Sequence, residues 1–268
     1  MSGALAADPR RRAGHRARFG YLADVAVHLV RTDLATRHRG SALGWLWALA
    51  PPVMQLVATY FVFTRVIPLD VEDYPVFLLV GILSWNWFAR SLNDGAVAFE
   101  QRRELVRRPG FENALLPIVS VLVAAADYLF AVPVMLVAVA LTAGLNASAL
   151  VFPVLVVLQG LYCVGLAMLV APLQVFLRDV RQIVGLLVSV GFWITPIFYG
   201  RAQVPDSLSW IYTVNPMAYI VGSERSALIS GSWPSPVTIV GLALGGLATL
   251  AAGYAVYHSL RDRVPEQL

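Results

Sequence analysis

Residues 31–52 read RTDLATRHRGSALGWLWALAPP, and within this stretch a charged segment gives way to an apolar one. Three arginines (Arg31, Arg37 and Arg39) lie before Ser41, and two tryptophans follow it. Basic residues next to an apolar run with tryptophan are typical of a chain entering a bilayer from the cytoplasm. The stretch therefore predicts a membrane-spanning segment starting near residue 42. We expect Pro51 and Pro52, which lack backbone N–H donors, to kink it.

The whole composition agrees with a membrane protein. Of 268 residues, 58% are hydrophobic and 13% charged, and the mean hydropathy is +0.69. A soluble chain of this length has too little interior for so much apolar surface. The net charge of +4 comes from arginine alone, and cytoplasmic loops explain it better than a nucleic-acid partner does.

Several kinds of site are excluded by composition. Without lysine the chain has no phosphate-binding loop of the kind that ends in lysine and serine or threonine, so any ATPase must be another polypeptide. The single cysteine, Cys163, forms no intrachain disulfide, and no Cys/His cluster predicts a metal site.

The apolar segments predict an all-α integral membrane fold with six spans. A span needs roughly 20 apolar residues. The predicted spans cover residues 42–66, 74–89 or slightly beyond, 115–143, 150–177, 183–199 and 237–257. The fifth is short and ends in ITPIFYG, where proline and glycine stop a helix.

Arginine counts predict the orientation. The N-terminal segment, the loop between spans two and three, the RDVR link and the C-terminal tail hold 8, 4, 2 and 2 of the 20 arginines. The positive-inside rule therefore places both termini in the cytoplasm. Residues 1–18 are expected to form a basic cytoplasmic tail and residues 259–268 a second one.

Residues 19–40 are predicted to form an amphipathic helix in the membrane interface. Apolar residues recur at helical spacing: Phe19, Leu22, Val25, Ala26, Leu29 and Val30. The helix is too polar to span the bilayer. Two interpretations stay open: a surface anchor, or an element that packs beside a cytoplasmic partner and aligns it.

Two charged segments face the predicted cytoplasmic side. The first is expected to be helical as far as Arg108 and carries Glu100, Arg102, Arg103, Glu104, Arg107 and Arg108. The second is the RDVR link with Arg178 and Asp179. A charge run is commonly a solvated face, but a compact segment of mixed sign also suits docking into a groove on a partner.

Residues 200–236, on the predicted exterior, are too apolar for a loop in water and too broken for a span. The Asn215-Pro216 step divides them into two short amphipathic pieces. A re-entrant helical hairpin fits better than a free loop, because broken backbone at membrane depth must be buried by protein or line a cavity. A hairpin lying flat on the outer leaflet is the alternative.

Aromatic and polar residues within the spans give further candidates. The aromatics are Tyr60, Phe63, Trp85, Trp87, Phe192, Trp193, Phe198 and Tyr199. They suit an interfacial belt or stacking against sugar rings. Asp127 is an acid within span three, and is either functional, protonated or bonded to a neighbouring helix. Gln55, Gln159 and Gln174 either line a polar path or join helices.

Four motifs, in order, resemble the permease subunits of ABC exporters for polysaccharides such as O-antigen and teichoic acid. They are RHRGSALGWLWALAPP, ELVRRPGFENALLPIVSVL, FLRDVRQIVGLLVSVGFWITPIFY and NPMAYIVGSERSAL. The resemblance covers nearly the whole chain after the N-terminal tail. It implies that residues 41–258 form a six-span permease domain.

The resemblance implies a homodimer with two copies of a separate ATPase that binds ATP and Mg, this chain being no enzyme and binding no cofactor itself. Residues 99–108 would be the coupling helix, with Arg178 and Asp179 beside it. Residues 200–236 would be the exterior gate, with Thr195, Pro196, Asn215, Pro216 and Arg225. The cargo would be a polyprenyl-diphosphate-linked glycan in the bacterial inner membrane. Arg31, Arg37 and Arg39 would attract its diphosphate, although anchoring to anionic headgroups explains them as well.

Two alternatives remain. A related exporter of drugs or small lipids shares the six-span plan. A proton-coupled secondary transporter using Asp127 belongs to another class, but the two halves of the sequence show no inverted repeat.

Overall fold

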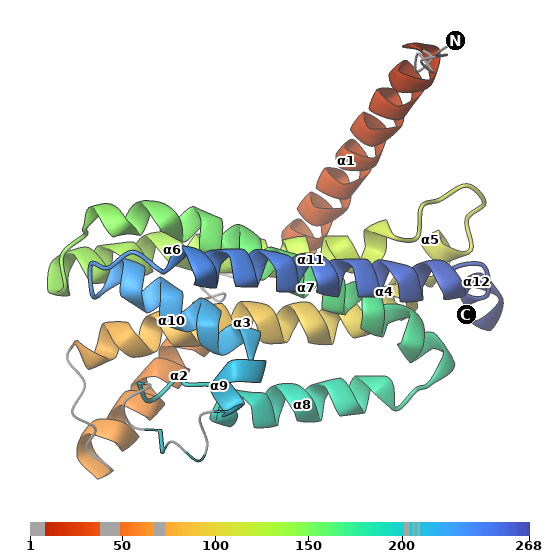
Figure 1. The fold of residues 1–268 in the computed structure, drawn as a ribbon. Coiled ribbons are helices and arrows are strands. Elements are labelled where there is room, and N and C mark those ends of the chain that lie inside the picture. The colour runs from red at the N-terminus through yellow and green to blue at the C-terminus, as the bar shows by residue number, and fades with distance from the viewer. Residues whose placement is uncertain (1–8, 38–48, 67–72, 201–203, 206, 208–209) are drawn as a thin grey trace.

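The computed structural model describes residues 9–37, 49–66, 73–200, 204–205, 207 and 210–268. All regular structure in these residues is helical. The long helices run side by side as a bundle, and α1 projects from it (Figure 1). The chain therefore has the all-helical architecture that the sequence predicts.

Four described helices are long and apolar enough to cross a membrane. They are α3 (Tyr74–Ala96), α6 (Leu115–Thr142), the run Ala147–Phe176, in which the 3-10 turn η3 (Ala147–Val151) leads into α7 (Phe152–Phe176), and α11 (Pro236–Leu260). They match the second, third, fourth and sixth predicted spans.

The other two predicted spans are not among these four. The first is represented by α2 (Ala50–Phe61) and the π-helical turn η2 (Val62–Val66), while residues 42–48 lie outside the described residues. The fifth is α8 (Val180–Ile194), with 15 residues. It stops before Thr195, which is extended because a residue preceding proline is pushed out of the helical region. By length and composition, six spans are therefore not established.

The kink expected at Pro51 and Pro52 involves the turn before Leu49, which lies outside the described residues. Both prolines stand in the first turn of α2, after the N-cap residue Leu49. Proline is tolerated there, because first-turn N–H groups have no helical acceptor. Within the described residues, the two prolines therefore begin α2.

A helix covers the segment predicted to lie in the membrane interface, and it extends further towards the N-terminus than predicted. α1 covers Pro9–Arg37, so it includes half of the segment expected to be a tail. Its buried contact is Ala26, which packs with Leu22, Val25 and Leu29 against the first turns of α6. The predicted apolar stripe is thus the face that contacts the bundle.

At the end of the bundle that carries the C-terminus, two short helices replace the single predicted helix. α4 (Ala98–Gln101) and α5 (Arg103–Val106) are separated at Arg102, whose φ of −125° and ψ of 39° are not helical. The prediction of a continuous helix to Arg108 is therefore wrong. We call residues 98–108 the elbow. The buried side chains of Phe99 and Val106 anchor it, and Val264 of α12 (Val264–Gln267) joins the same core cluster.

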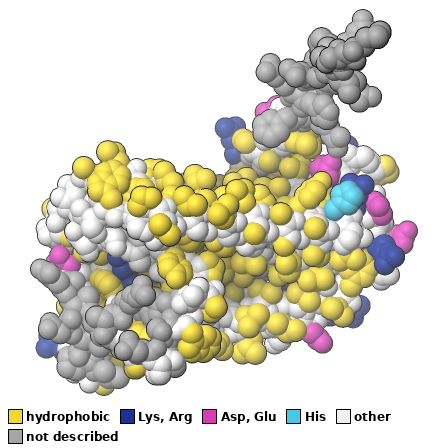
Figure 2. Space-filling view, in the orientation of Figure 1, with side chains coloured by type: hydrophobic (Ala, Val, Ile, Leu, Met, Phe, Trp, Pro, Cys, Tyr) yellow, Lys and Arg dark blue, Asp and Glu magenta, His cyan; other side chains and the backbone are white. Residues whose placement is uncertain are grey.

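At the opposite end, α9 (Trp210–Val214) and α10 (Pro216–Leu228) follow α8. α10 begins at an Asn215 side chain that accepts a hydrogen bond from the Met217 amide, and it packs against α3 and α7. Apolar side chains cover the flank of the bundle, and charged ones gather mainly at the C-terminal end (Figure 2). This distribution suits a molecule whose flank contacts lipid.

Candidate functional site

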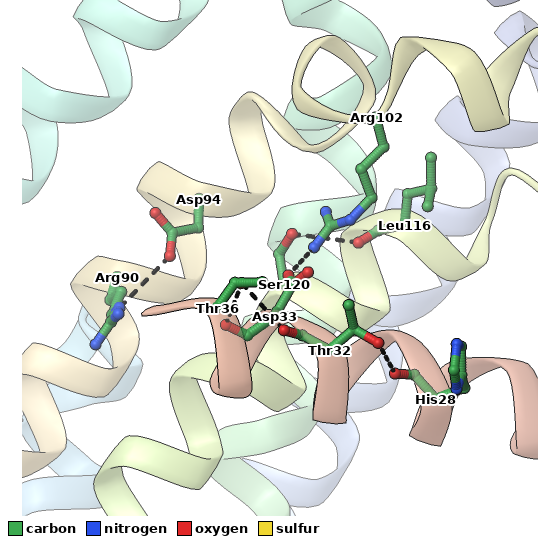
Figure 3. Close-up of polar contacts among 9 residues, drawn as sticks. All are labelled: His28, Thr32, Asp33, Thr36, Arg90, Asp94, Arg102, Leu116 and Ser120. Carbon is green, nitrogen blue, oxygen red and sulfur yellow. Dashed lines mark hydrogen bonds and ion pairs between the residues drawn. The ribbon is translucent and has the colours of Figure 1, made fainter. Parts of the chain in front are cut away.

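The elbow presents most of its predicted docking residues to solvent. Glu100, Arg103, Glu104, Arg107 and Arg108 are exposed. Arg102 differs, because its side chain is 12% exposed and forms an ion pair with Asp33 of α1 (Figure 3). The break between α4 and α5 thus separates an outward-facing charged surface from an inward-facing arginine.

Gln174, near the end of α7, connects the elbow to the RDVR link. Its Nε2 donates to Glu100 at 3.1 Å, and its Oε1 accepts from the Arg181 amide at 2.6 Å. Arg178 and Asp179 are exposed beside it. The two charged segments predicted to form one docking surface are therefore joined through a buried side chain.

The arginines of the opening stretch are only partly described. Arg31 is exposed on α1. Arg37 is the last residue of α1, and its side chain lies outside the described part of the chain, as does the whole of Arg39. The structure therefore places one of these side chains at the surface of α1.

Asp127 of α6 is paired with a neighbouring helix. Arg90 of α3 forms ion pairs with Asp127 and, at 3.5 Å, with Asp94 (the Asp94 pair is drawn in Figure 3). Both Arg90 and Asp127 line a cavity of about 400 Å3 between α2, α3 and α6, together with Gln55 and Asn86. Of the interpretations left open for Asp127, the structure supports bonding to a neighbouring helix.

The three glutamines also join helices. Gln55 of α2 accepts from Asn86 of α3 at 3.0 Å, and Gln159 of α7 donates to the Ser84 carbonyl of α3 at 2.8 Å. With Gln174, each makes a contact to another element. The interpretation as helix-joining residues is therefore confirmed.

Most of the predicted aromatics form one group where α2, α3 and α8 meet. Phe198 contacts the rings of Phe63, Phe192 and Trp193, with centroids 5.4, 4.8 and 5.1 Å away, and Phe192 also contacts Trp85. Trp193 is 63% exposed, so one edge of the group is open in the isolated chain.

The remaining aromatics lie around or away from this group. The Tyr199 hydroxyl donates to the carbonyl of Ile194 at 2.9 Å. The rings of Tyr60 and Tyr74 are neighbours, with 6.4 Å between their centroids. Trp87 stacks on Tyr128 of α6, with 4.9 Å between the ring centroids. It points away from Trp85 because residues two apart on a helix lie on nearly opposite faces. The structure therefore does not bring Trp87 to the other aromatics.

The predicted exterior residues meet at one junction. The Asn215 Nδ2 donates to the Thr195 hydroxyl at 2.8 Å, directly before Pro216 begins α10. Arg225 donates to the carbonyl of Pro196 at 2.6 Å. These contacts connect the segment after α8 to both ends of α10.

Glu224 is a buried acid that sequence reasoning missed. The Ser84 hydroxyl donates to its carboxylate, and the Tyr128 hydroxyl contributes a long bond of 3.5 Å. The carboxylate is fully buried where α10 meets α3 and α6. A glutamate on the apolar face of a short helix, next to Arg225, was the available signal, because a buried acid needs partners.

Comparisons with known proteins cover nearly all of this chain. A family model described as ABC-2 type transporter matches residues 26–229. The O-antigen export system permease protein of Klebsiella pneumoniae is 28% identical over 251 residues, 93% of this chain and 96% of that protein. Its counterpart in Myxococcus xanthus is 29% identical over 245 residues, covering 90% and 94%. The polysialic acid transport protein of Escherichia coli is 24% identical over 236 residues, covering 86% and 91%.

Proposed function

The chain belongs to the ABC-2 type transporter family, and from that premise we propose that it is the permease subunit of an ATP-driven polysaccharide exporter. The observation that carries the proposal is similarity along almost the full length to permeases named for O-antigen export. The multi-pass helical fold, with apolar helices long enough to span a bilayer, supports it.

The proposed partner is an ATPase that docks on the C-terminal end of the bundle. The exposed charges of the elbow, with Arg178 and Asp179 beside them, form a surface of mixed sign suited to a complementary groove. ATP and Mg are bound by that partner, and this chain supplies the membrane path.

We propose a homodimer with two ATPase copies, both termini in the cytoplasm and the bundle in the bacterial inner membrane. The isolated chain exposes large apolar side chains on α2 and α8, among them Met54 and Phe61 (68% and 60%) and Leu186 and Leu187 (64% each). A second copy packed on these faces would cover them and place the aromatic group beside a central path.

The aromatic group supplies a surface of the kind that stacks on sugar rings. Phe63 comes from η2, Phe192 and Trp193 from the end of α8, and Phe198 from the segment after α8, next to the Thr195–Asn215 junction. We assign the path to this side and the exterior gate to the re-entrant residues 200–236, of which α10 is the best-described part. Trp87, stacked on Tyr128, takes no part in the path.

The proposed cargo is a glycan on a polyprenyl diphosphate. Guanidinium groups bind phosphate oxygens in bidentate fashion, and exposed Arg31 lies on the helix assigned to the inner interface. Arg37 and Arg39 are assigned the same role from their place in the sequence. A drug or small-lipid exporter is the second candidate, because the family plan does not by itself fix the cargo.

The test uses the native membrane. The tagged chain should co-purify with one ATPase, and an inactive form of that ATPase should abolish surface polysaccharide while lipid-linked glycan accumulates inside. Collapse of the proton gradient with ATP maintained should leave export unchanged. Export that follows the gradient instead would contradict the proposal and favour a proton-coupled transporter.

A further inference from the structure

The ion pair between Asp33 and Arg102 ties the elbow to α1 across 69 positions of sequence. The side chain of Arg102 is 12% exposed and that of Asp33 is 28% exposed. In a pair shielded from water in this way, removal of one partner leaves the other charge poorly solvated, which is costly. The contact is therefore suited to hold two elements in a fixed relation.

The local backbone is arranged around this contact. Phe99 and Val106, 0% and 3% exposed, anchor the elbow on either side of the break. Arg102 lies three residues after the first and four before the second, so a continuous helix would aim it at the apolar core. The non-helical conformation of Arg102 instead accompanies a side chain that reaches Asp33.

The elbow thus has two faces with different partners. Arg103, Glu104, Arg107 and Arg108 are open to solvent, while Arg102 contacts α1. α1 otherwise meets the bundle mainly through aliphatic side chains around Ala26, which permit sliding more readily than a directional ion pair does. A displacement of the elbow would therefore be passed to α1 at Asp33.

We propose that Asp33 and Arg102 are positioning residues that couple movement of the elbow to movement of α1. This rests on the proposed function, because it takes an ATPase seated on the exposed face of the elbow as the source of the displacement. α1 is then a moving part of the transport cycle, and exposed Arg31, two residues before Asp33, shifts with it.

The experiment compares charge reversals in the intact complex with its ATPase in membranes. The variants are Asp33→Arg, Arg102→Asp and the double exchange, with exposed Asp24→Arg on the same helix as the matched control. We expect each single reversal to lower export per ATP hydrolysed at least fivefold, a ratio that does not depend on how much ATPase is bound. In the double exchange, export per ATP hydrolysed should recover to within twofold of the wild-type value. The Asp24→Arg control should have the wild-type value.

The proposal is overturned if the single variants export normally, or if the double exchange does not recover when its membrane level is normal. If a single variant fails to accumulate, recovery in the double exchange decides the matter.

Hydrogen exchange of the α1 amides, with and without trapped ATP, is independent of the cargo. The exchange rate of these amides should differ between the two nucleotide states in the wild type and in the double exchange. It should not differ in either single variant. Equal exchange in both nucleotide states of the wild type would overturn the coupling, whereas a normal response without polysaccharide export would refute the proposed function alone.

Discussion

Arg225 shows how one buried charge holds together the end of the bundle opposite the C-terminus. Its guanidinium donates to the carbonyls of Phe77, Pro196 and Ile197 over 2.6–3.1 Å, and its Cζ lies 3.4 Å from the centroid of the Phe77 ring. Pro196 and Ile197 lie in non-helical backbone after α8, where carbonyls need partners other than helical amides. The fork of donors on arginine reaches all three carbonyls at once.

We predict that Arg225→Lys destabilises the protein while keeping its charge. A single ammonium cannot reproduce this fork, and buried carbonyls left without donors cost about 1–3 kcal/mol. Thermal unfolding in detergent should show a lower midpoint than the wild type. Exposed Arg263→Lys is the control and should melt with the wild type. An unchanged midpoint for Arg225→Lys would show that the carbonyl contacts add nothing.

Residues that could be predicted from sequence are those whose chemistry is unusual for their surroundings. Asp127 drew attention because a charge is costly at membrane depth, and Arg225 because it falls in the motif NPMAYIVGSERSAL. The partner of Asp127 could not be predicted, because Arg90 lies 37 positions earlier in the chain and meets it only through packing of α3 on α6. Glu224 lies outside the predicted spans, and its signal, an acid on the apolar face of a short helix, was missed.

The helices and their errors show what periodicity does and does not determine. Long apolar runs gave α3, α6, α7 and α11 with ends close to those expected, because length and hydropathy alone decide them. The break at Arg102 accompanies a tertiary contact with Asp33, and α2 starts at Ala50 with both prolines in its first turn. The local sequence pattern predicts neither the break nor the start of α2. Its one hint at the break is that Arg102 would share a helical face with the apolar residues Phe99 and Val106.

Close packing of α7 on α11 leads to a prediction for Gly253. A Cβ at this position would lie 2.0 Å from the Gly165 carbonyl oxygen, so the two helices would have to separate. Gly253→Ala should therefore lower the free energy of unfolding by about 1–3 kcal/mol. Gly241→Ala on the same helix meets nothing within 4 Å and should be neutral or slightly stabilising. Equal melting temperatures for the two variants in detergent would contradict the packing.

The whole molecule separates its chemistry by position. The exposed charges of the elbow and the RDVR link lie at the C-terminal end, the aromatic group lies where α2, α3 and α8 meet, and the Arg225 contacts lie at the last turn of α10. The sequence predicted this order along the chain, because arginine counts and apolar runs are local properties. It did not predict the cross-connections through Gln174 and Arg102, which depend on how distant segments fold together.

Transport by the purified complex tests the central claim most directly. The chain and its co-purified ATPase would be placed in lipid vesicles with a fluorescently labelled, lipid-linked polysaccharide, and the label accessible on the far side would be measured. The account predicts that label appears there only with ATP and Mg, and that it persists when the proton gradient is collapsed. Translocation of the label without ATP hydrolysis would contradict the account. So would the absence of translocation when the ATPase in the same vesicles hydrolyses ATP and responds to a different cargo.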